Sequence, residues 1–298
     1  MVKYEKIRDE NPIFIYKSFI IKENKDSIDV EYVFSIPNLA EFTPSWSFPK
    51  PSGTSILNDN TFKRLVFLLG MTEAVSYWKA VCSPEMRVEC GSLSDEEIQW
   101  WKKLYYLGLG EFFYINKINA NYETFINIST YGQLYTKQNF DNRKLTGCLV
   151  PIGGGKDSAL TIELLKNAGI DCKCYAINSR NSITATVETA GLNKDNLITV
   201  KRNFDRSLIA LNNSGYLNGH TPFSAIVAFS SKITAYLYGL KYIVLSNESS
   251  ANESTVVGQN VNHQYSKSFE FEYDFYSYDE KFLHTGIKYF SFLRPITE

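Results

Sequence analysis

Three consecutive glycines at positions 153–155 constrain this chain more than any other feature. They stand between an apolar segment typical of a strand and a segment typical of a helix that opens with Lys156, Asp157 and Ser158. Glycines let a backbone approach a ligand closely, and a helix start adds unpaired N–H groups and the positive end of the helix dipole. Because a lysine opposes that dipole unless anions are bound, the run predicts a phosphate site rather than a plain turn.

The spacing of this run excludes two common phosphate-binding motifs. A Walker motif requires a further glycine ahead of Gly-Lys-Ser/Thr, and a dinucleotide fingerprint separates its glycines. The run is similar instead to the PP-loop, Ser-Gly-Gly-Lys-Asp-Ser, of the ATP pyrophosphatases, which cleave ATP to AMP and pyrophosphate. Gly153 stands where that motif has its first serine, so one hydroxyl contact to the pyrophosphate is expected to be lost.

The part of the chain after residue 143 alternates between strand and helix patterns. Strands are expected at 148–152, 172–177, 197–201 and 242–246, and helices at 157–167 and 222–238. This alternation predicts an α/β fold, a parallel sheet with helices on both faces, whose ligands lie at the carboxyl ends of the strands. The glycine run lies at such an end.

The first part of the chain predicts a small α+β domain. Strands at 14–16, 28–34 and 42–48 are expected to form a small antiparallel sheet, followed by helices at 61–82 and 94–107. The second helix opens with Ser94-Asp95-Glu96-Glu97, a capping signature. The polar segment 139–146 is the candidate linker, which gives an N-terminal domain at 1–143 and a PP-loop domain at 144–298.

Composition narrows the classes of function. The 298 residues carry a net charge of −1, which lacks the basic surface of a nucleic-acid binder and suits a small charged substrate. No apolar run approaches the roughly 18 residues of a membrane span, and the N-terminus is charged, so a cytoplasmic protein that does not contact a membrane is expected. The five cysteines include no Cys-x-x-Cys pair, which supports neither a disulfide framework nor a zinc site.

Four further stretches, at 69–84, 218–222, 246–253 and 261–270, extend the similarity beyond the PP-loop. With it they resemble the ATP-dependent epimerase of peptidoglycan synthesis, the MurL family. The resemblance implies inversion of the terminal L-glutamate of UDP-N-acetylmuramoyl-L-alanyl-L-glutamate, with ATP and Mg²⁺, in cell wall biogenesis. It also implies a chain that continues past Arg294-Pro295, so the second domain is expected to be truncated at its C-terminus.

The chemistry of a peptide-terminal glutamate favours activation of its carboxylate. The residue has no free amine and cannot form the pyridoxal imine on which many racemases depend. Transfer of AMP would remove the carboxylate charge and give an acyl-adenylate, whose α-proton a base can take and an acid can return on the opposite face. Hydrolysis would then release AMP and the inverted product.

The resemblance and phosphate chemistry together assign the loop residues. Lys156 would neutralise phosphate charge, and Asp157 would bind magnesium. Asn178 and Ser179 follow the second strand of the sheet and are expected to meet adenine or ribose. The pyrophosphate would be held by Gly153, Gly154, Gly155 and Ser158.

Two glutamates and two histidines are candidates for metal binding and proton transfer. Glu248 and Glu253 are too far apart for one helical face, so one is expected to bind metal beside Asp157, namely Glu248, and the other to serve Cα. His220 and His263 lie in polar loops, where substrate contact, proton transfer and ordinary loop hydrogen bonds are all open. The loop glutamates equally allow a solvated role. Expected substrate-binding residues are Asn247, Asn252, Asn262, Tyr265 and Lys267.

Other functions remain open at this stage. A PP-loop amidotransferase or thiolase would use the same activation, but the chain shows neither an N-terminal cysteine nucleophile nor a basic RNA-binding stretch. A non-catalytic nucleotide-binding protein is favoured by the missing serine and opposed by the intact Lys156-Asp157-Ser158. The identity of the Cα base, the number of magnesium ions and the oligomeric state stay open.

Overall fold

The computed structural model describes residues 3–56, 58–135, 144–249 and 265–296. Its strands are β1 Ile13–Glu23, β2 Ser27–Ile36, β3 Ala40–Phe42, β4 Ser45–Pro49, β5 Glu85–Val88, β6 Asn127–Thr130, β7 Thr146–Pro151, β8 Cys172–Ile177, β9 Leu197–Asn203, β10 Leu240–Leu245 and β11 Lys288–Ser291. Its α-helices are α1 Lys3–Glu10, α2 Asn60–Trp78, α3 Asp95–Gly108, α4 Gly110–Ile115, α5 Lys156–Asn167, α6 Asn181–Thr189, α7 Ser207–Asn213, α8 Phe223–Tyr238 and α9 Phe269–Tyr278. Short turns of other helix types are η1 Lys194–Asn196, η3 Tyr265–Lys267 and η4 Asp279–Leu283.

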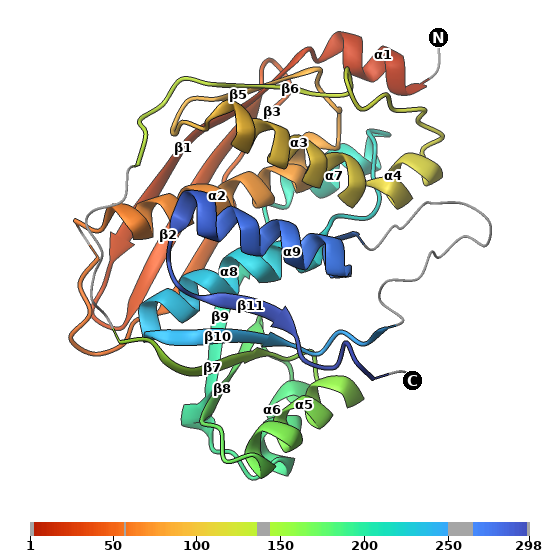
Figure 1. Cartoon of the computed structure of the whole chain (residues 1–298). Coiled ribbons are helices and arrows are strands. Elements are labelled where there is room, and N and C mark those ends of the chain that lie inside the picture. The colour runs from red at the N-terminus through yellow and green to blue at the C-terminus, as the bar shows by residue number, and fades with distance from the viewer. Residues whose placement is uncertain (1–2, 57, 136–143, 250–264, 297–298) are drawn as a thin grey trace.

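The strands form one sheet in the order β11-β10-β7-β8-β9-β4-β2-β1-β5-β6, with β3 paired to β2 (Figure 1). From β11 to β9 all pairs are parallel. In this half the chain starts in the middle, moves out through β8 and β9, and returns to the other side of β7 with β10. The sheet therefore has a switch point between β7 and β10, where α/β sheets bind their ligands.

Alternate residues of the parallel strands face two separate cores. Cys148 and Val150 of β7 pack with Ile162 of α5 and Val187 of α6, whereas Leu149 packs in the core that contains α8. This alternation follows from the two-residue period of a strand. The predicted α/β fold, with helices on both faces of a parallel sheet, is confirmed for this half of the molecule.

The N-terminal strands do not form a small sheet of their own, as the sequence predicted. They pair antiparallel as expected, but β4 also pairs with β9, with Ser45 opposite Asn203 and Trp46 opposite Arg202. The first residues of β9 pair with β8 and its last residues with β4. Without β9 the edge of β4 would carry unpaired N–H and C=O groups, which explains the join. The predicted boundary at 143/144 borders residues outside those described and stays a prediction.

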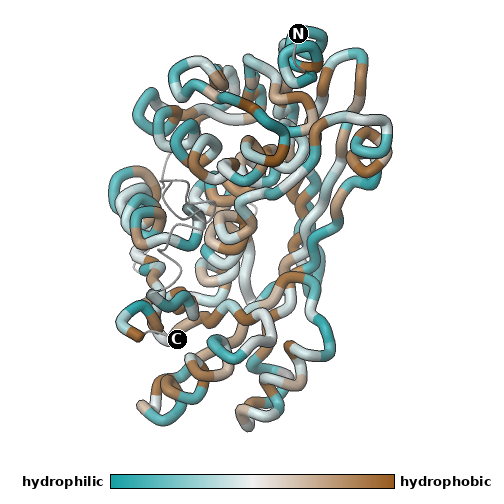
Figure 2. Tube along the Cα trace, turned by 90° about the vertical axis from the view of Figure 1, so that its right-hand side faces the viewer, coloured by the Kyte–Doolittle hydropathy of each residue, from teal (hydrophilic) through white to brown (hydrophobic). Residues whose placement is uncertain are grey.

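A helical layer of α2, α3, α8 and α9 covers one face of the sheet (Figure 1). Trp101 of α3 is fully buried there and stacks on Phe229 of α8 with 5.1 Å between ring centroids, so its predicted packing role is confirmed. The predicted capping signature is present as a capping box between Ser94 and Glu97. Along the outer helices, hydrophobic and hydrophilic residues alternate (Figure 2).

The cysteines and the helix lengths agree with the sequence. All five cysteines are free thiols, and both Cys172 and Cys174 are buried in the second core. Among the helices that the structure describes, none has the length and apolar character needed to cross a membrane.

Candidate functional site

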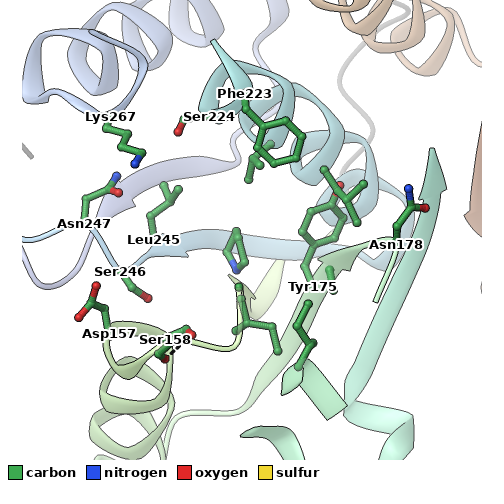
Figure 3. A pocket seen from close by; sticks show the side chains of 18 of the residues that line it. Asp157, Ser158, Tyr175, Asn178, Phe223, Ser224, Leu245, Ser246, Asn247 and Lys267 are labelled. Atoms are coloured by element: carbon green, nitrogen blue, oxygen red, sulfur yellow. Dashed lines mark hydrogen bonds between the residues drawn. The ribbon is translucent and has the colours of Figure 1, made fainter. Parts of the chain in front are cut away.

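A cavity of about 730 Å³ opens at the carboxyl ends of β7, β8, β9 and β10, at the switch point of the sheet (Figure 3). Its volume lies within the range of small-molecule sites, roughly 300–1,000 Å³. Its lining includes Gly153, Gly155, Asp157, Ser158, Tyr175, Asn178, Arg180, Arg202, Phe223, Ser224, Ser246, Asn247 and Lys267.

The three glycines have different structural roles. Gly154 has φ +81°, and a Cβ there would lie 3.0 Å from Ser182 Oγ, so this position requires glycine for the backbone itself. A Cβ on Gly153 or Gly155 would meet no protein atom within 4 Å, although both residues line the cavity. Gly155 is also the N-cap of α5 and has no side chain to accept from the first N–H groups of the helix. The loop thus leaves space and donors for an anion.

Ser158 and Asp157 extend the loop in different directions. The Ser158 hydroxyl donates to Gly155 O at 2.9 Å, so it fixes the turn as well as lining the cavity. The Asp157 side chain lies at the mouth of the cavity near Ser246 (Figure 3). Ser246 in turn is hydrogen-bonded to Thr161 of α5, with 2.8 Å between the hydroxyl oxygens, which joins the loop to the end of β10.

The residues expected near adenine or ribose divide. Asn178 lines the cavity, but its amide pairs with the backbone of Arg202: Nδ2 donates to the carbonyl at 2.8 Å, and Oδ1 accepts from the N–H at 2.9 Å. It therefore holds the ends of β8 and β9 together. Ser179 is outside the lining, and its hydroxyl oxygen is buried with no hydrogen-bond partner in the described part of the chain.

Asn247 and Lys267 lie on one side of the cavity, as the substrate assignment requires (Figure 3). Asn247 Nδ2 donates to Ser291 Oγ at 2.9 Å, and the Lys267 carbonyl accepts from Arg294 Nη2 at 2.9 Å. Glu272 holds both partners, because Ser291 and Arg294 each donate to its carboxylate. This network positions two cavity residues from different segments.

Three other predicted residues lie outside the cavity lining. Tyr265 is buried, its hydroxyl donates to the Asp274 carboxylate, and burial raises its pKa. Glu248 follows Asn247, and its carbonyl accepts from Arg294 at 3.2 Å. His220 Nδ1 lies 3.7 Å from the Glu111 carboxylate. The remaining predicted residues, Asn252, Glu253, Asn262 and His263, fall outside the described residues.

The sequence missed the contributions of α8 and β9 to the cavity. Phe223 and Ser224 begin α8, and Arg202 lies near the end of β9. The strand expected at 197–201 carried the signal for Arg202, because residues at the carboxyl ends of parallel strands meet at the ligand edge. Tyr175 forms an apolar wall, since burial raises its pKa and its hydroxyl bonds Ser230 Oγ at 2.7 Å.

The charge of the cavity favours an anion. Arg180, Arg202 and Lys267 contribute positive charge, and Asp157 is the single carboxylate among the lining residues that the structure describes. Within the described ranges, no group of three or more His, Cys, Asp or Glu side chains could hold a metal ion. Asp157 is thus the candidate metal ligand there, and a magnesium ion bound with phosphates needs only one or two carboxylates.

Fold and site together define an α/β protein with an anion-binding cavity at the switch point of a parallel sheet. The chain belongs to the MurL family: the family model described as the MurL N-terminal domain matches residues 5–292. The family predicted from the sequence is thereby confirmed.

Two relatives are each named UDP-N-acetyl-alpha-D-muramoyl-L-alanyl-L-glutamate epimerase. The protein of Xanthomonas oryzae pv. oryzae is 32% identical over 244 residues, which are 81% of this chain and 52% of the relative. That of a Micromonospora species is 34% identical over 242 residues, 80% of this chain and 52% of the relative. The chain spans about half the length of these curated relatives. No solved structure matches it.

Proposed function

We propose that this chain is the ATP-binding part of a cytoplasmic epimerase that inverts the terminal L-glutamate of UDP-N-acetylmuramoyl-L-alanyl-L-glutamate during peptidoglycan precursor synthesis. One observation carries the proposal. The glycine run forms an open, positively charged cradle at the switch point of the sheet, in a chain whose relatives are named for that epimerisation. The PP-loop assignment explains why an epimerase would need such a cradle.

The loop fits the phosphates of ATP. Space beside Gly153 and Gly155 and the start of α5 suit a pyrophosphate group, and Lys156 in the first turn supplies positive charge. Asp157 is placed to bind Mg²⁺ together with phosphate oxygens. Phe223, which is 47% exposed at the cavity, offers an apolar face for a base.

The first step is transfer of AMP to the substrate. A carboxylate oxygen of the terminal glutamate attacks the α-phosphorus of ATP, and the bond from that phosphorus to the pyrophosphate oxygen breaks. Negative charge grows on the departing pyrophosphate, where the loop N–H groups and Lys156 stabilise it. The product is a mixed anhydride that no longer carries the carboxylate charge.

The second step is inversion at Cα. Loss of the carboxylate charge acidifies the α-proton, so a base can remove it and an acid can return a proton to the opposite face. Water then cleaves the anhydride and gives AMP and the D-glutamate product. Glu253 and His263 remain predictions for the proton transfers. His220 and Glu248 lie outside the lining, which makes them weaker candidates.

Exchange of labelled pyrophosphate into ATP, driven by the dipeptide substrate, tests the first step. Lys156→Ala and Asp157→Asn are each expected to reduce exchange about a hundredfold or more, because both act on phosphate charge. Lys166→Ala, a lysine at the other end of α5, is the matched control and should exchange normally. Near-normal exchange in either loop variant would contradict the PP-loop assignment.

Isotope incorporation tests the second step. In heavy water with ATP and Mg²⁺, deuterium should appear at Cα of the terminal glutamate, and inversion should require cleavage of ATP to AMP. Inversion without ATP, or formation of ADP, would overturn the proposed mechanism. Exchange driven by an unrelated acid in place of the dipeptide would favour a PP-loop amidotransferase or thiolase.

A further inference from the structure

A second cavity of about 150 Å³ adjoins the first, and Arg202 and Phe223 line both. We call it the Lys79 cavity. It lies between Lys79 at the end of α2, Asn212 of α7 and the segment that leads into α8, which contributes Thr221. At about 30 Å³ for each water molecule, this space suits a group the size of a carboxylate with its adjoining methylenes.

Lys79 brings a buried positive charge to this cavity. It is 6% exposed, and its ammonium group donates to Gly219 O, to Thr221 Oγ1 at 2.7 Å and to His220 O at 3.4 Å. All three acceptors are neutral. Among the residues that the structure describes, no carboxylate forms an ion pair with Lys79. A buried charge without an opposite charge is costly, so this arrangement suits a bound anion.

The carboxylate nearest in the network is committed to another cation. Glu73 of α2 binds Arg202 through both oxygens, with 2.8 Å to Nη2 and 3.0 Å to Nε, and also accepts from Trp46 Nε1 at 3.2 Å. Two cations and one anion therefore surround the cavity. Burial lowers the pKa of Lys79 to about 8, and the charge of Arg202 acts in the same direction. The cavity carries one positive charge that the described residues leave unbalanced.

Asn212 provides a second, independent observation. Its Oδ1 atom is buried and has no hydrogen-bond partner among the described residues, although Asn212 lines the cavity. Buried polar atoms in folded proteins are nearly always hydrogen-bonded, so this atom indicates a missing partner in the space that it borders.

We infer that the Lys79 cavity binds the carboxylate of the substrate that is not activated, the side-chain carboxylate of its terminal acidic residue. The inference rests on the proposed function, in which one carboxylate of that residue is adenylated in the adjoining cavity. A single negative charge balances the single excess positive charge. A phosphate group, which is larger and carries more acceptor oxygens, would face the carbonyls of Gly219 and His220. The carboxylate is therefore favoured over a nucleotide phosphate.

The test compares two peptides that differ only in this charge. Calorimetry measures the affinity of the full chain for L-alanyl-L-glutamate and L-alanyl-L-glutamine, which share the terminal carboxylate. The parent chain should bind the glutamate peptide at least about tenfold more tightly. In Lys79→Met the two affinities should agree within about twofold. Lys102→Met is the matched control, because Lys102 is also buried and donates to a carbonyl, Glu123 O at 2.7 Å, away from both cavities.

Each alternative gives a different result. If Lys79 only holds the segment at 219–221, both peptides weaken equally in Lys79→Met and the tenfold preference persists, which overturns the inference. A loss of ATP affinity with an unchanged peptide preference would assign the site to a nucleotide phosphate and also overturn it. No preference in the parent chain does the same.

A measurement on the parent chain avoids any folding defect of the variant. The preference for the glutamate peptide should decline at alkaline pH as the Lys79 ammonium deprotonates, since Arg202, the other ionisable residue of the described lining, stays charged. A preference independent of pH up to 11 would overturn the inference. Pyrophosphate exchange in the same preparations reports the proposed function separately: exchange with no peptide preference contradicts only the Lys79 cavity, and preference without exchange contradicts only adenylation.

Discussion

The helical layer around Trp101 and the open strand ends around the glycine run satisfy their polar groups in opposite ways. In the helical layer the protein supplies both partners: Glu97 binds Arg64 and accepts from the Tyr278 hydroxyl at 2.6 Å. At the strand ends, α5 begins on a glycine, and the cation of Lys79 has only neutral acceptors among the described residues. The comparison indicates that stability resides in the first region, whereas the second depends on a ligand to complete its interactions.

Removal of a large side chain from the helical layer should have the largest effect on stability. Trp101 is fully buried and contacts aromatic rings of α8 and of the segment after α9. Trp101→Ala is expected to lower the free energy of unfolding by about 3–5 kcal/mol through lost burial and a residual cavity, measured by denaturant titration. Trp101→Phe should lose less. A loss below about 1 kcal/mol for the alanine variant would show that the layer is not the stable region.

The charge of Lys79 should make stability depend on pH. Burial lowers its pKa from 10.5 to about 8, so between these values the unfolded chain binds more protons than the folded chain. The free energy of unfolding therefore rises with pH from about 8 to 10.5, by at most about 3 kcal/mol, and the cost of the buried charge is fully present below pH 8.

Lys79→Met removes this contribution. The difference in the free energy of unfolding between parent and variant, measured by denaturant titration at pH 7 and pH 10, isolates Lys79 from the tyrosines and cysteines that titrate in both. The parent should gain relative to the variant at pH 10. An identical difference at both pH values would show that Lys79 is not held as a costly buried charge.

The smallest effects on stability are expected in the loop, where two glycines form a matched pair. Gly154→Ala should destabilise the fold by about 1–2 kcal/mol, because its φ is +81° and its Cβ would approach Ser182. Gly155→Ala, with φ −96° and open space, should change stability by under about 0.5 kcal/mol yet weaken ATP binding, because its Cβ enters the cavity. Equal ATP affinity for Gly155→Ala and the parent would show that ATP does not approach this glycine.

Local patterns in the sequence predicted most elements of the fold. The strand expected at 172–177 matches β8, and the helix expected at 94–107 begins at its predicted cap, because alternation and capping depend on neighbouring residues. The pairing of β4 with β9 could not be predicted. It joins residues far apart in the sequence, and neither strand carries a local signal for its partner.

The same division holds for the candidate site. Asp157, Asn178 and Asn247 follow strand ends, and all three line the cavity, since topology alone brings such residues together. Tyr265 was expected to bind substrate and is instead buried in the packing beside α9. Lys79 was not singled out, because its significance depends on which carboxylates lie near it after folding.

The pairing of β4 with β9 has a consequence for synthesis of the protein. β4 leaves the ribosome long before Asn203, the partner of Ser45, is translated, and at about 5–20 residues per second the delay is on the order of ten seconds. During that time the nascent chain presents a strand edge with unpaired N–H and C=O groups, which can pair with another nascent chain. The growing chain is therefore most exposed to misassembly on a polysome, and chaperone occupancy should fall once β9 has emerged.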